Sequence, residues 1–313
     1  MARLATTRER MLANAGLLVM VAMAGGFFPI LERLLVSWDA LSVTAGRQLL
    51  GGVALTLVLA LNERRLPWPS RAVLGRLLLL GGIGIGLGSL LTSLAVGWSD
   101  GVSAAILSAA NPFMAALIAR VVEGQRLSRA ILTGAVLAVA GGLIAVLAGG
   151  AEIGSFRGGE LLMLGAGALW TLYSILAQRW LAGHSQLAIA ALTTLPAGIV
   201  LTAAVGILAA GGALAPRIDL SLPSLLMMGY SGLLSIGIGN VLWHYGVSRV
   251  GVAVATMYTN LIPVATVLVT VALGVAPQPA QLLGGAVILA AVLYAQLAGR
   301  QPVAATRRRR GAA

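Results

Sequence analysis

Polar and aromatic side chains recur at i, i+3 and i+4 spacing inside stretches that are otherwise apolar, so they share helix faces. Aromatic surface beside a few hydrogen-bonding groups is what a cavity for a small amphiphilic molecule needs. The plain alternative is that the hydroxyls bond to their own helix backbone and that the aromatic rings anchor helix ends. The candidate substrate-binding residues on such faces are Ser108, Asn111, Trp170, Tyr173, Asn240, Trp243, His244, Tyr258 and Asn260.

Two charged or titratable side chains stand out within the apolar stretches. Arg47 lies about seven residues into one of them, where a charge is costly without polar company. Thr44 and Gln48 supply that company. Arg47 and Gln48 are therefore candidates for binding a substrate carboxylate, and a structural role for the arginine is the alternative. His244 is the candidate proton carrier, because imidazole titrates near neutral pH, and a packing role is its alternative.

Two prolines, Pro112 and Pro263, interrupt apolar stretches close to asparagines. Proline removes a backbone hydrogen bond and kinks or ends a helix. Inside a membrane, such irregular backbone is tolerated where it is buried in protein or lines a watery cavity. We expect both prolines to mark kinks that gate a central cavity, with a role in packing alone as the alternative.

The sequence carries no recognisable catalytic or cofactor site. It contains no H-E-x-x-H motif, no cysteine and no lysine, so thiol chemistry and a G-x-x-x-x-G-K-[ST] nucleotide loop are excluded. The glycine run GGIGIGLG at residues 81–88 lies in an apolar stretch and fits helix packing better than nucleotide binding. We expect no enzyme activity, no metal and no cofactor.

The composition is that of an integral membrane protein. Of 313 residues, 59% are hydrophobic and 10% are charged, compared with roughly 25% charged residues in soluble domains. The net charge of +12 comes entirely from arginines that lie between the apolar runs, and the basic tail 307–310 suits anionic headgroups better than nucleic acid. We expect lipid and a small molecule as partners, and no nucleic acid.

The arginines also predict the number and direction of the membrane crossings. Seventeen arginines fall on the side of the N-terminus and three on the other side, which places both termini in the cytoplasm by the positive-inside rule. Both ends on one side require an even number of crossings. An alternative reading, a cleaved signal peptide ending at Ala22-Met23-Ala24, is disfavoured because the apolar run continues to Leu31. The ten predicted segments are 12–31, 40–61, 73–97, 101–119, 130–149, 159–181, 186–210, 222–246, 250–273 and 280–298.

An internal repeat appears when the chain is shifted by 151 residues. This shift places Pro112 on Pro263 and Gly134-Ala135-Val136 on Gly285-Ala286-Val287. Each copy holds five predicted helices, and because five is odd the second copy is inverted relative to the first. Inverted repeats in transporters place the substrate near the membrane midplane between the copies. The predicted organisation is a first repeat at 1–150, a second at 151–300 and a basic cytoplasmic tail at 301–313.

These repeats resemble a known family. The stretches LSVTAGRQLLGGVAL (41–55), GQRLSRAILTGAVLAVAGG (124–142), GALWTLYSILAQR (167–179) and PQPAQLLGGAVILAAV (277–292) resemble the paired EamA domains of the drug/metabolite transporter superfamily. Within it the chain looks most like the YddG-type amino-acid exporters of bacterial inner membranes. The chain departs from common family patterns at Gly25-Gly26, where tryptophan is frequent, and at Val275-Ala276-Pro277, which lacks an acidic residue.

The resemblance and the repeat together imply a secondary transporter. We expect an all-α membrane protein that exports neutral or aromatic amino acids by alternating access between inverted repeats. A lipid flippase or scramblase, or an exporter of cationic drugs, is the alternative. All nine acidic residues lie at segment ends or in loops, which favours export down a substrate gradient over proton coupling. Nothing in the sequence indicates an oligomer.

Overall fold

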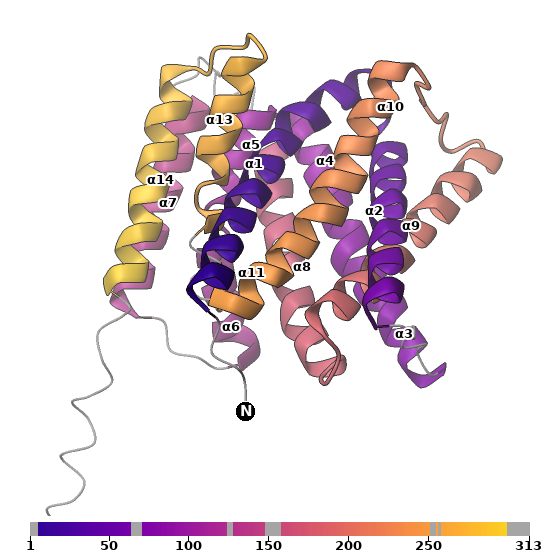
Figure 1. Ribbon diagram of the computed structural model, residues 1–313. Coiled ribbons are helices and arrows are strands. Elements are labelled where there is room, and N and C mark those ends of the chain that lie inside the picture. Colours follow the sequence, from indigo (N-terminus) through magenta and orange to yellow (C-terminus); the bar gives the residue numbers. More distant parts are fainter. Residues whose placement is uncertain are drawn as a thin grey trace, which may run out of the picture.

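The computed structural model describes residues 6–63, 71–123, 128–147, 158–250, 255 and 258–298. Every regular element in these ranges is a helix, and the helices stand side by side in one bundle (Figure 1). α1 begins at the end of the bundle that we call the terminus end, and the other end is called the far end (Figure 1). The predicted tail at 301–313 and the predicted division between residues 150 and 151 lie outside the described residues.

The helices fall into two series. The first contains α1 (Thr7–Ser37), α2 (Ala40–Glu63), α3 (Arg71–Leu79), η1 (Leu80–Leu87), α4 (Gly88–Trp98), α5 (Gly101–Ser108), α6 (Asn111–Glu123) and α7 (Arg129–Leu147). The second contains α8 (Gly159–Trp180), α9 (Gln186–Ala210), α10 (Leu222–Gly229), η3 (Tyr230–Ile238), α11 (Gly239–Val250), α13 (Ile262–Ala272) and α14 (Pro279–Ala298). The π-helical η1 and η3 continue their neighbours into the rods Val73–Trp98 and Leu222–Val250.

Among the described residues, six helices are long and apolar enough to cross a membrane, and they overlap the predicted segments 12–31, 40–61, 73–97, 159–181, 186–210 and 222–246. The other predicted segments correspond to shorter apolar pieces in the described ranges. Segment 101–119 is divided into α5 and α6, and segments 130–149, 250–273 and 280–298 contain α7, α13 and α14. An all-helical, multi-pass membrane protein is therefore confirmed, whereas the number ten stays a prediction.

The two series share their irregularities as well as their helices. A shift of 151 residues carries η1 from 80–87 to 231–238, which lies within η3. The same shift carries the turn at Ala109–Ala110, between α5 and α6, onto the turn at Asn260–Leu261 before α13. π-Helical turns are rare and often mark functional sites, so their matching positions are a strong sign of an internal repeat.

The first helix of each series packs mainly against helices of the other series. α1 packs against α11 and α13 of the second series, while α8 packs against α4 and α6 of the first. The remaining large contacts also join the series, since α2 packs against α9 and α7 against α14. The two repeats are therefore interlocked, and neither forms a closed bundle by itself.

Glycines allow the closest of these contacts, between α2 and α9. A Cβ atom on Gly52 would lie 2.5 Å from the Cα of Leu195, and one on Gly198 would lie 2.5 Å from the backbone N of Leu49. Real Cβ atoms do not approach backbone this closely. The two helices thus touch backbone to backbone, as small residues permit in membranes.

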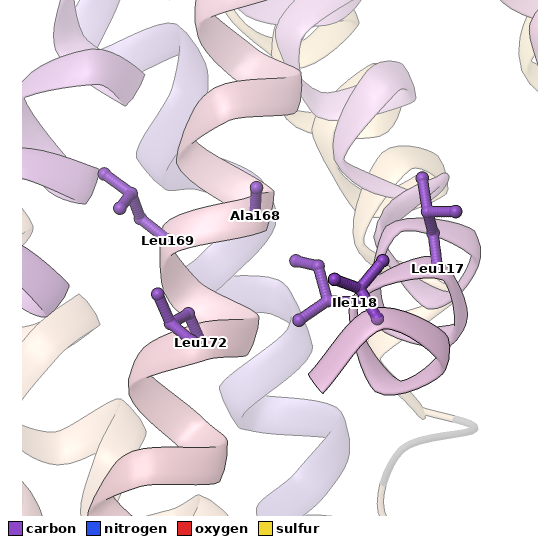
Figure 2. Close-up of a pocket in the computed structure, with 6 residues that line it drawn as sticks. Leu117, Ile118, Ala168, Leu169 and Leu172 are labelled. Atoms are coloured by element: carbon purple, nitrogen blue, oxygen red, sulfur yellow. The ribbon is translucent and has the colours of Figure 1, made fainter. Parts of the chain in front are cut away.

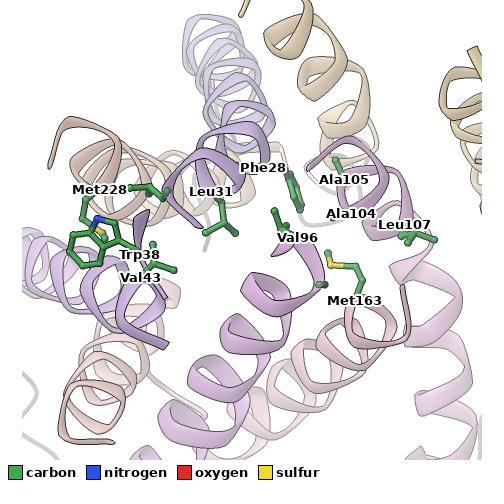
Figure 3. Close-up of a cluster of buried hydrophobic side chains, with 12 residues drawn as sticks. Phe28, Leu31, Trp38, Val43, Val96, Ala104, Ala105, Leu107, Met163 and Met228 are labelled. Atoms are coloured by element: carbon green, nitrogen blue, oxygen red, sulfur yellow. The ribbon is translucent and has the colours of Figure 1, made fainter. Parts of the chain in front are cut away.

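An apolar cluster closes the bundle toward the far end. This end cluster combines residues of α1, the start of α2, α4, α5, α8 and α10, and therefore both series (Figure 3). Its fully buried members include Leu31, Leu34, Val43, Ala95 and Ala104. The end cluster therefore packs helices of both series together at this end of the bundle.

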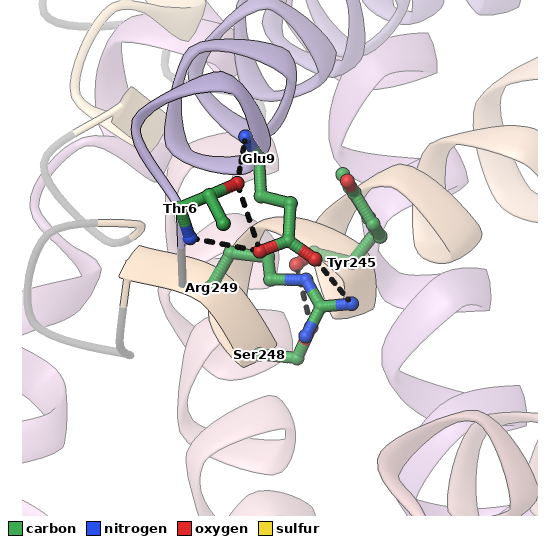
Figure 4. Close-up of polar contacts among 5 residues, drawn as sticks. All are labelled: Thr6, Glu9, Tyr245, Ser248 and Arg249. Atoms are coloured by element: carbon green, nitrogen blue, oxygen red, sulfur yellow. Dashed lines mark hydrogen bonds and ion pairs between the residues drawn. The ribbon is translucent and has the colours of Figure 1, made fainter. Parts of the chain in front are cut away.

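Hydrogen bonds between the series reinforce the same end. The Ser37 and Ser224 hydroxyl oxygens lie 3.4 Å apart, and the Trp38 indole donates to the carbonyl of Asp219 at 3.2 Å. The Asp219 carboxylate accepts hydrogen bonds from Ser224 and from Ser221, and these bonds lower the pKa of its carboxyl group. At the terminus end, Arg249 of α11 pairs with Glu9 of α1 at 3.5 Å (Figure 4).

Candidate functional site

The two helix interruptions lie at matching places, close to the predicted kinks. α6 begins at Asn111, directly after the turn at Ala109–Ala110, and Pro112 is its second residue. Pro263 is likewise the second residue of α13. A proline is well tolerated there, because the first backbone N–H groups of a helix have no partner within it. The prolines thus start new helices rather than kink continuous ones.

Asparagines at both interruptions carry buried amide atoms that lack a hydrogen-bond partner. These atoms are Asn111 Oδ1 and Asn260 Nδ2, and Asn260 is buried. The Asn111 amide lies against α8, since a Cβ on Gly167 would stand 2.1 Å from its Oδ1. Ser108 instead donates to the carbonyl of Ala105 at 2.6 Å, which is the plain structural role for a helix serine.

A second polar group joins α2 to α4. The Thr44 and Ser93 hydroxyl oxygens lie 2.7 Å apart, and the side-chain amide of Gln48 donates to the Ser89 hydroxyl. Thr44 and Gln48 are both buried, so each satisfies part of its hydrogen-bonding capacity across the helix interface. These bonds fix the orientation of α2, and with it the direction of Arg47.

Arg47 extends toward α1 instead of α4. Its guanidinium carbon lies 4.3 Å from the centre of the Phe27 ring, a cation–π contact. The residue is only 5% exposed, and its Nε and Nη1 atoms have no hydrogen-bond partner. On α2 the acidic residues stand just before its first turn and at its last residue, at Asp39 and Glu63. The side chain is therefore buried and oriented, and two of its nitrogen atoms have unused hydrogen-bonding capacity.

Trp170 and Tyr173 lie next to one another on α8, with ring centres 5.4 Å apart, but have different surroundings. Tyr173 is buried against η1, and its hydroxyl lies 2.9 Å from that of Thr193 on α9. Trp170 is 52% exposed. Around the axis of α8, Trp170 lies between Tyr173, which contacts η1, and Gly167, which contacts α6. Its exposed surface therefore faces the interior of the bundle.

We predict that Tyr173→Phe weakens the fold without being decisive for transport. The hydroxyl is buried and bonds to Thr193, which itself donates to the carbonyl of Ile189 at 2.7 Å and keeps that bond in the variant. The expected loss is about 0.6–1 kcal/mol in the free energy of unfolding. Chemical unfolding in detergent micelles measures it. The control Tyr294→Phe changes an exposed hydroxyl and should cost nothing, and equal losses for both variants would contradict the prediction.

The candidates on α11 and before α13 lie toward the terminus end. Trp243 and Tyr258 are half-buried and pack on the same apolar cluster with Leu17 and Met20 of α1. Asn240 donates to the carbonyl of Ile236 in its own helix at 2.6 Å. These placements agree with packing and backbone roles for the three residues.

His244 lines a cavity that opens between α2, α9 and α11. The cavity holds about 380 Å³ and is also bordered by Asn62, Ser185, Gln186 and Ser248. Both ring nitrogens of His244 are buried without a hydrogen-bond partner. The cavity lies at the terminus end, where α2 ends and α9 begins.

A groove of about 350 Å³ lies between α6 and α8 (Figure 2). Its lining is wholly apolar and includes Leu117, Ile118, Ala168 and Leu172. Leu172 stands two residues after Trp170, on the opposite side of α8. The groove therefore faces outward, toward lipid.

The structure groups the predicted residues into separate sets. It separates Arg47 from Gln48, since Arg47 stacks on Phe27 of α1 and Gln48 bonds to Ser89 of α4. It brings Trp170 next to Tyr173, and it packs Trp243 and Tyr258 on one apolar cluster. Four partners were missed by the sequence reasoning: Phe27, Ser89, Ser93 and Thr193. The spacing of Ser89 and Ser93 at i and i+4 was a usable signal, whereas the contact between Phe27 and Arg47 depends on how α1 and α2 pack.

The chain was compared with known proteins. The model of the EamA-like transporter family matches it twice, at residues 11–147 and 157–295. It is 30% identical over 211 residues to a probable terminal-alkyne amino-acid exporter of Streptantibioticus cattleyicolor, a match covering 66% of this chain and 69% of that protein. It is 23% identical over 224 residues to the uncharacterized transporter YyaM of Bacillus subtilis, covering 70% and 72%.

One solved crystal structure shares the fold across almost the whole chain. The superposition covers 95% of this chain and 99% of the other, with a TM-score of 0.58 and 18% sequence identity. The two matches to the family model together span most of the sequence, and they confirm the resemblance noted from the repeat. The protein is a multi-pass membrane transporter that belongs to the EamA-like family of the drug/metabolite transporter superfamily.

Proposed function

We propose that this transporter exports neutral or aromatic amino acids across a bacterial inner membrane, by alternating access of two inverted repeats. In this proposal the chain crosses the membrane ten times, both termini are cytoplasmic, and the protein performs no chemical step. The observation that carries it is the pair of matching helix interruptions, each with one buried asparagine side-chain atom that lacks a hydrogen-bond partner. Transporters use such interrupted helices to bind substrate near the midplane.

Further support comes from the polarity of the interior. The exposed indole of Trp170 gives an aromatic surface, and Arg47 places a positive charge within α2. The described acidic residues lie nearer to helix ends than Arg47 does, with Glu32 of α1 the deepest of them, so a cationic drug would meet an unfavourable potential near Arg47. The relative named as an amino-acid exporter points to the same substrate class.

A lipid flippase or scramblase is the second candidate. The wholly apolar groove between α6 and α8 favours it, because an acyl chain fits such a surface. Proteoliposomes distinguish the two functions. Efflux of radiolabelled leucine, phenylalanine and tryptophan is measured with and without a pH gradient, and redistribution of a fluorescent phospholipid is measured on the same vesicles. We expect amino-acid efflux that does not need the gradient, and lipid movement alone would overturn the proposal.

Replacing Trp170 should weaken transport of aromatic substrates selectively. Loss of an aromatic contact by Trp170→Leu is expected to raise the KM for phenylalanine about 3- to 10-fold, with a smaller effect for leucine. The matched control is Trp98→Leu, because Trp98 is 48% exposed but stands at the far end of α4. If the two variants change the KM equally, Trp170 does not contact the substrate.

A further inference from the structure

We propose that Arg47 binds the carboxylate of the transported amino acid, so that the transporter selects substrates by their free acid group. This inference rests on the proposed function. Its starting point is the electrostatic state of Arg47: a guanidinium that is 5% exposed, with Nε and Nη1 unpaired. Buried charges in proteins are normally paired, so binding of an anion would stabilise an unpaired charge on a fixed side chain.

The neighbours of Arg47 hold it in place without neutralising it. Thr44 and Gln48, one turn before it and one residue after it, direct their side chains to Ser93 and Ser89 of α4. Phe27 supports the guanidinium plane at 4.3 Å. A stacked guanidinium still offers its N–H groups at the edge, and their planar fork matches the two oxygens of a carboxylate.

The position of Arg47 along the bundle agrees with a binding site on the terminus-end side of the end cluster. Arg47 follows Val43 of the end cluster by four residues on α2, a rise of about 6 Å toward the terminus end. Trp170 follows Met163 of the same cluster by seven residues on α8, a rise of about 10 Å in the same direction. Both residues therefore lie on the terminus-end side of Val43 and Met163 in the end cluster.

The second repeat does not duplicate this arginine. The 151-residue shift places Gly198 on Arg47, and Gly198 is used for the backbone contact with Leu49 of α2. The charge at this position is therefore a feature of the first repeat alone. A single charged group is what an asymmetric ligand requires, because only one end of an amino acid carries the carboxylate.

The test compares each substrate with its carboxamide. Equilibrium binding of L-phenylalanine, L-leucine and their amides is measured on the detergent-purified protein at neutral pH. The wild-type protein should bind the acids at least about 10-fold more tightly than the amides. Arg47→Gln should lower the affinity for the acids about 10- to 100-fold and leave the amides nearly unchanged. Arg47→Lys keeps the charge but loses the planar guanidinium that binds both carboxylate oxygens, so its affinity for the acids should lie between those of the wild type and Arg47→Gln.

Arg76→Gln is the matched control. Arg76 also stacks on an aromatic ring, that of Trp180 at 5.9 Å, but it is exposed, so the preference for acids should be unchanged. The inference is overturned if the wild-type protein binds acids and amides equally, a result that needs no folded variant. It is also overturned if Arg47→Gln weakens both ligands by the same factor. Absence of amino-acid binding and efflux in the wild type would refute the proposed function itself.

Discussion

Gly198→Ala should remove most of the folded protein from the membrane. The new Cβ would lie 2.5 Å from the backbone N and 2.6 Å from the Cα of Leu49, so α9 must move away from α2. Backbone cannot yield as a flexible side chain can, and overpacking of this kind costs about 3 kcal/mol. The contact between α2 and α9 joins the two repeats, so its loss affects the whole bundle. Fluorescence-detected size exclusion after detergent extraction measures the folded yield.

Gly206→Ala on the same helix is the control. Nothing lies within 4 Å of the position of its Cβ, and alanine favours the helix by about 1 kcal/mol over glycine. The same substitution is thus expected to act in opposite directions at two positions of α9, eight residues apart. A Gly198→Ala variant with the yield and melting temperature of Gly206→Ala would show that the close contact between α2 and α9 does not exist.

A disulfide between Ser37→Cys and Ser224→Cys should abolish transport in a reversible way. The two hydroxyl oxygens lie 3.4 Å apart, and they join the last residue of α1 to α10 of the other repeat. The native chain has no cysteine, so the introduced pair has no competing partner. If the repeats rock against each other, closing the far end permanently stops the cycle. Efflux from proteoliposomes should fall to background after oxidation and return after reduction.

The matched control is a second hydroxyl pair within one repeat. Thr44 and Ser93 lie 2.7 Å apart on α2 and α4, so Thr44→Cys with Ser93→Cys should form a bond without tying the repeats together. Oxidation of this pair is expected to leave the maximal rate of the same variant in its reduced form unchanged. Wild-type efflux by the fully oxidised Ser37/Ser224 pair would refute relative motion of the repeats at the far end.

Much of the architecture could be predicted from the sequence because it depends on local patterns. The long apolar runs gave six membrane-length helices, and the 151-residue register that joined Pro112 to Pro263 also relates the helix interruptions and the π-helical segments. The structure adds that each proline starts a helix. The kink expected from proline alone was wrong in detail, because the preceding turns at Ala109–Ala110 and Asn260–Leu261 already divide the segments.

The candidate site could be predicted only in part. Helical spacing showed which residues share a face, but not which neighbour covers that face. Tyr173 and Trp170 share a face in the sequence, yet only Tyr173 is buried against another helix, where it bonds to Thr193. Trp243 differs from Trp170 in the same way, because it packs on α1. Such differences arise from contacts between distant segments, which no single sequence displays.

The exchange of first helices between the repeats has a consequence for synthesis. α1 leaves the ribosome before its neighbours α11 and α13, which follow only after about 200 further residues. At 5–20 residues per second, that delay is about 10–40 s. During this time the face of α1 that later meets Ala265 and Tyr230, through Gly25 and Gly26, must remain covered by lipid or by the insertion machinery. Maturation of this transporter is therefore completed by its last helices, which close around the first one.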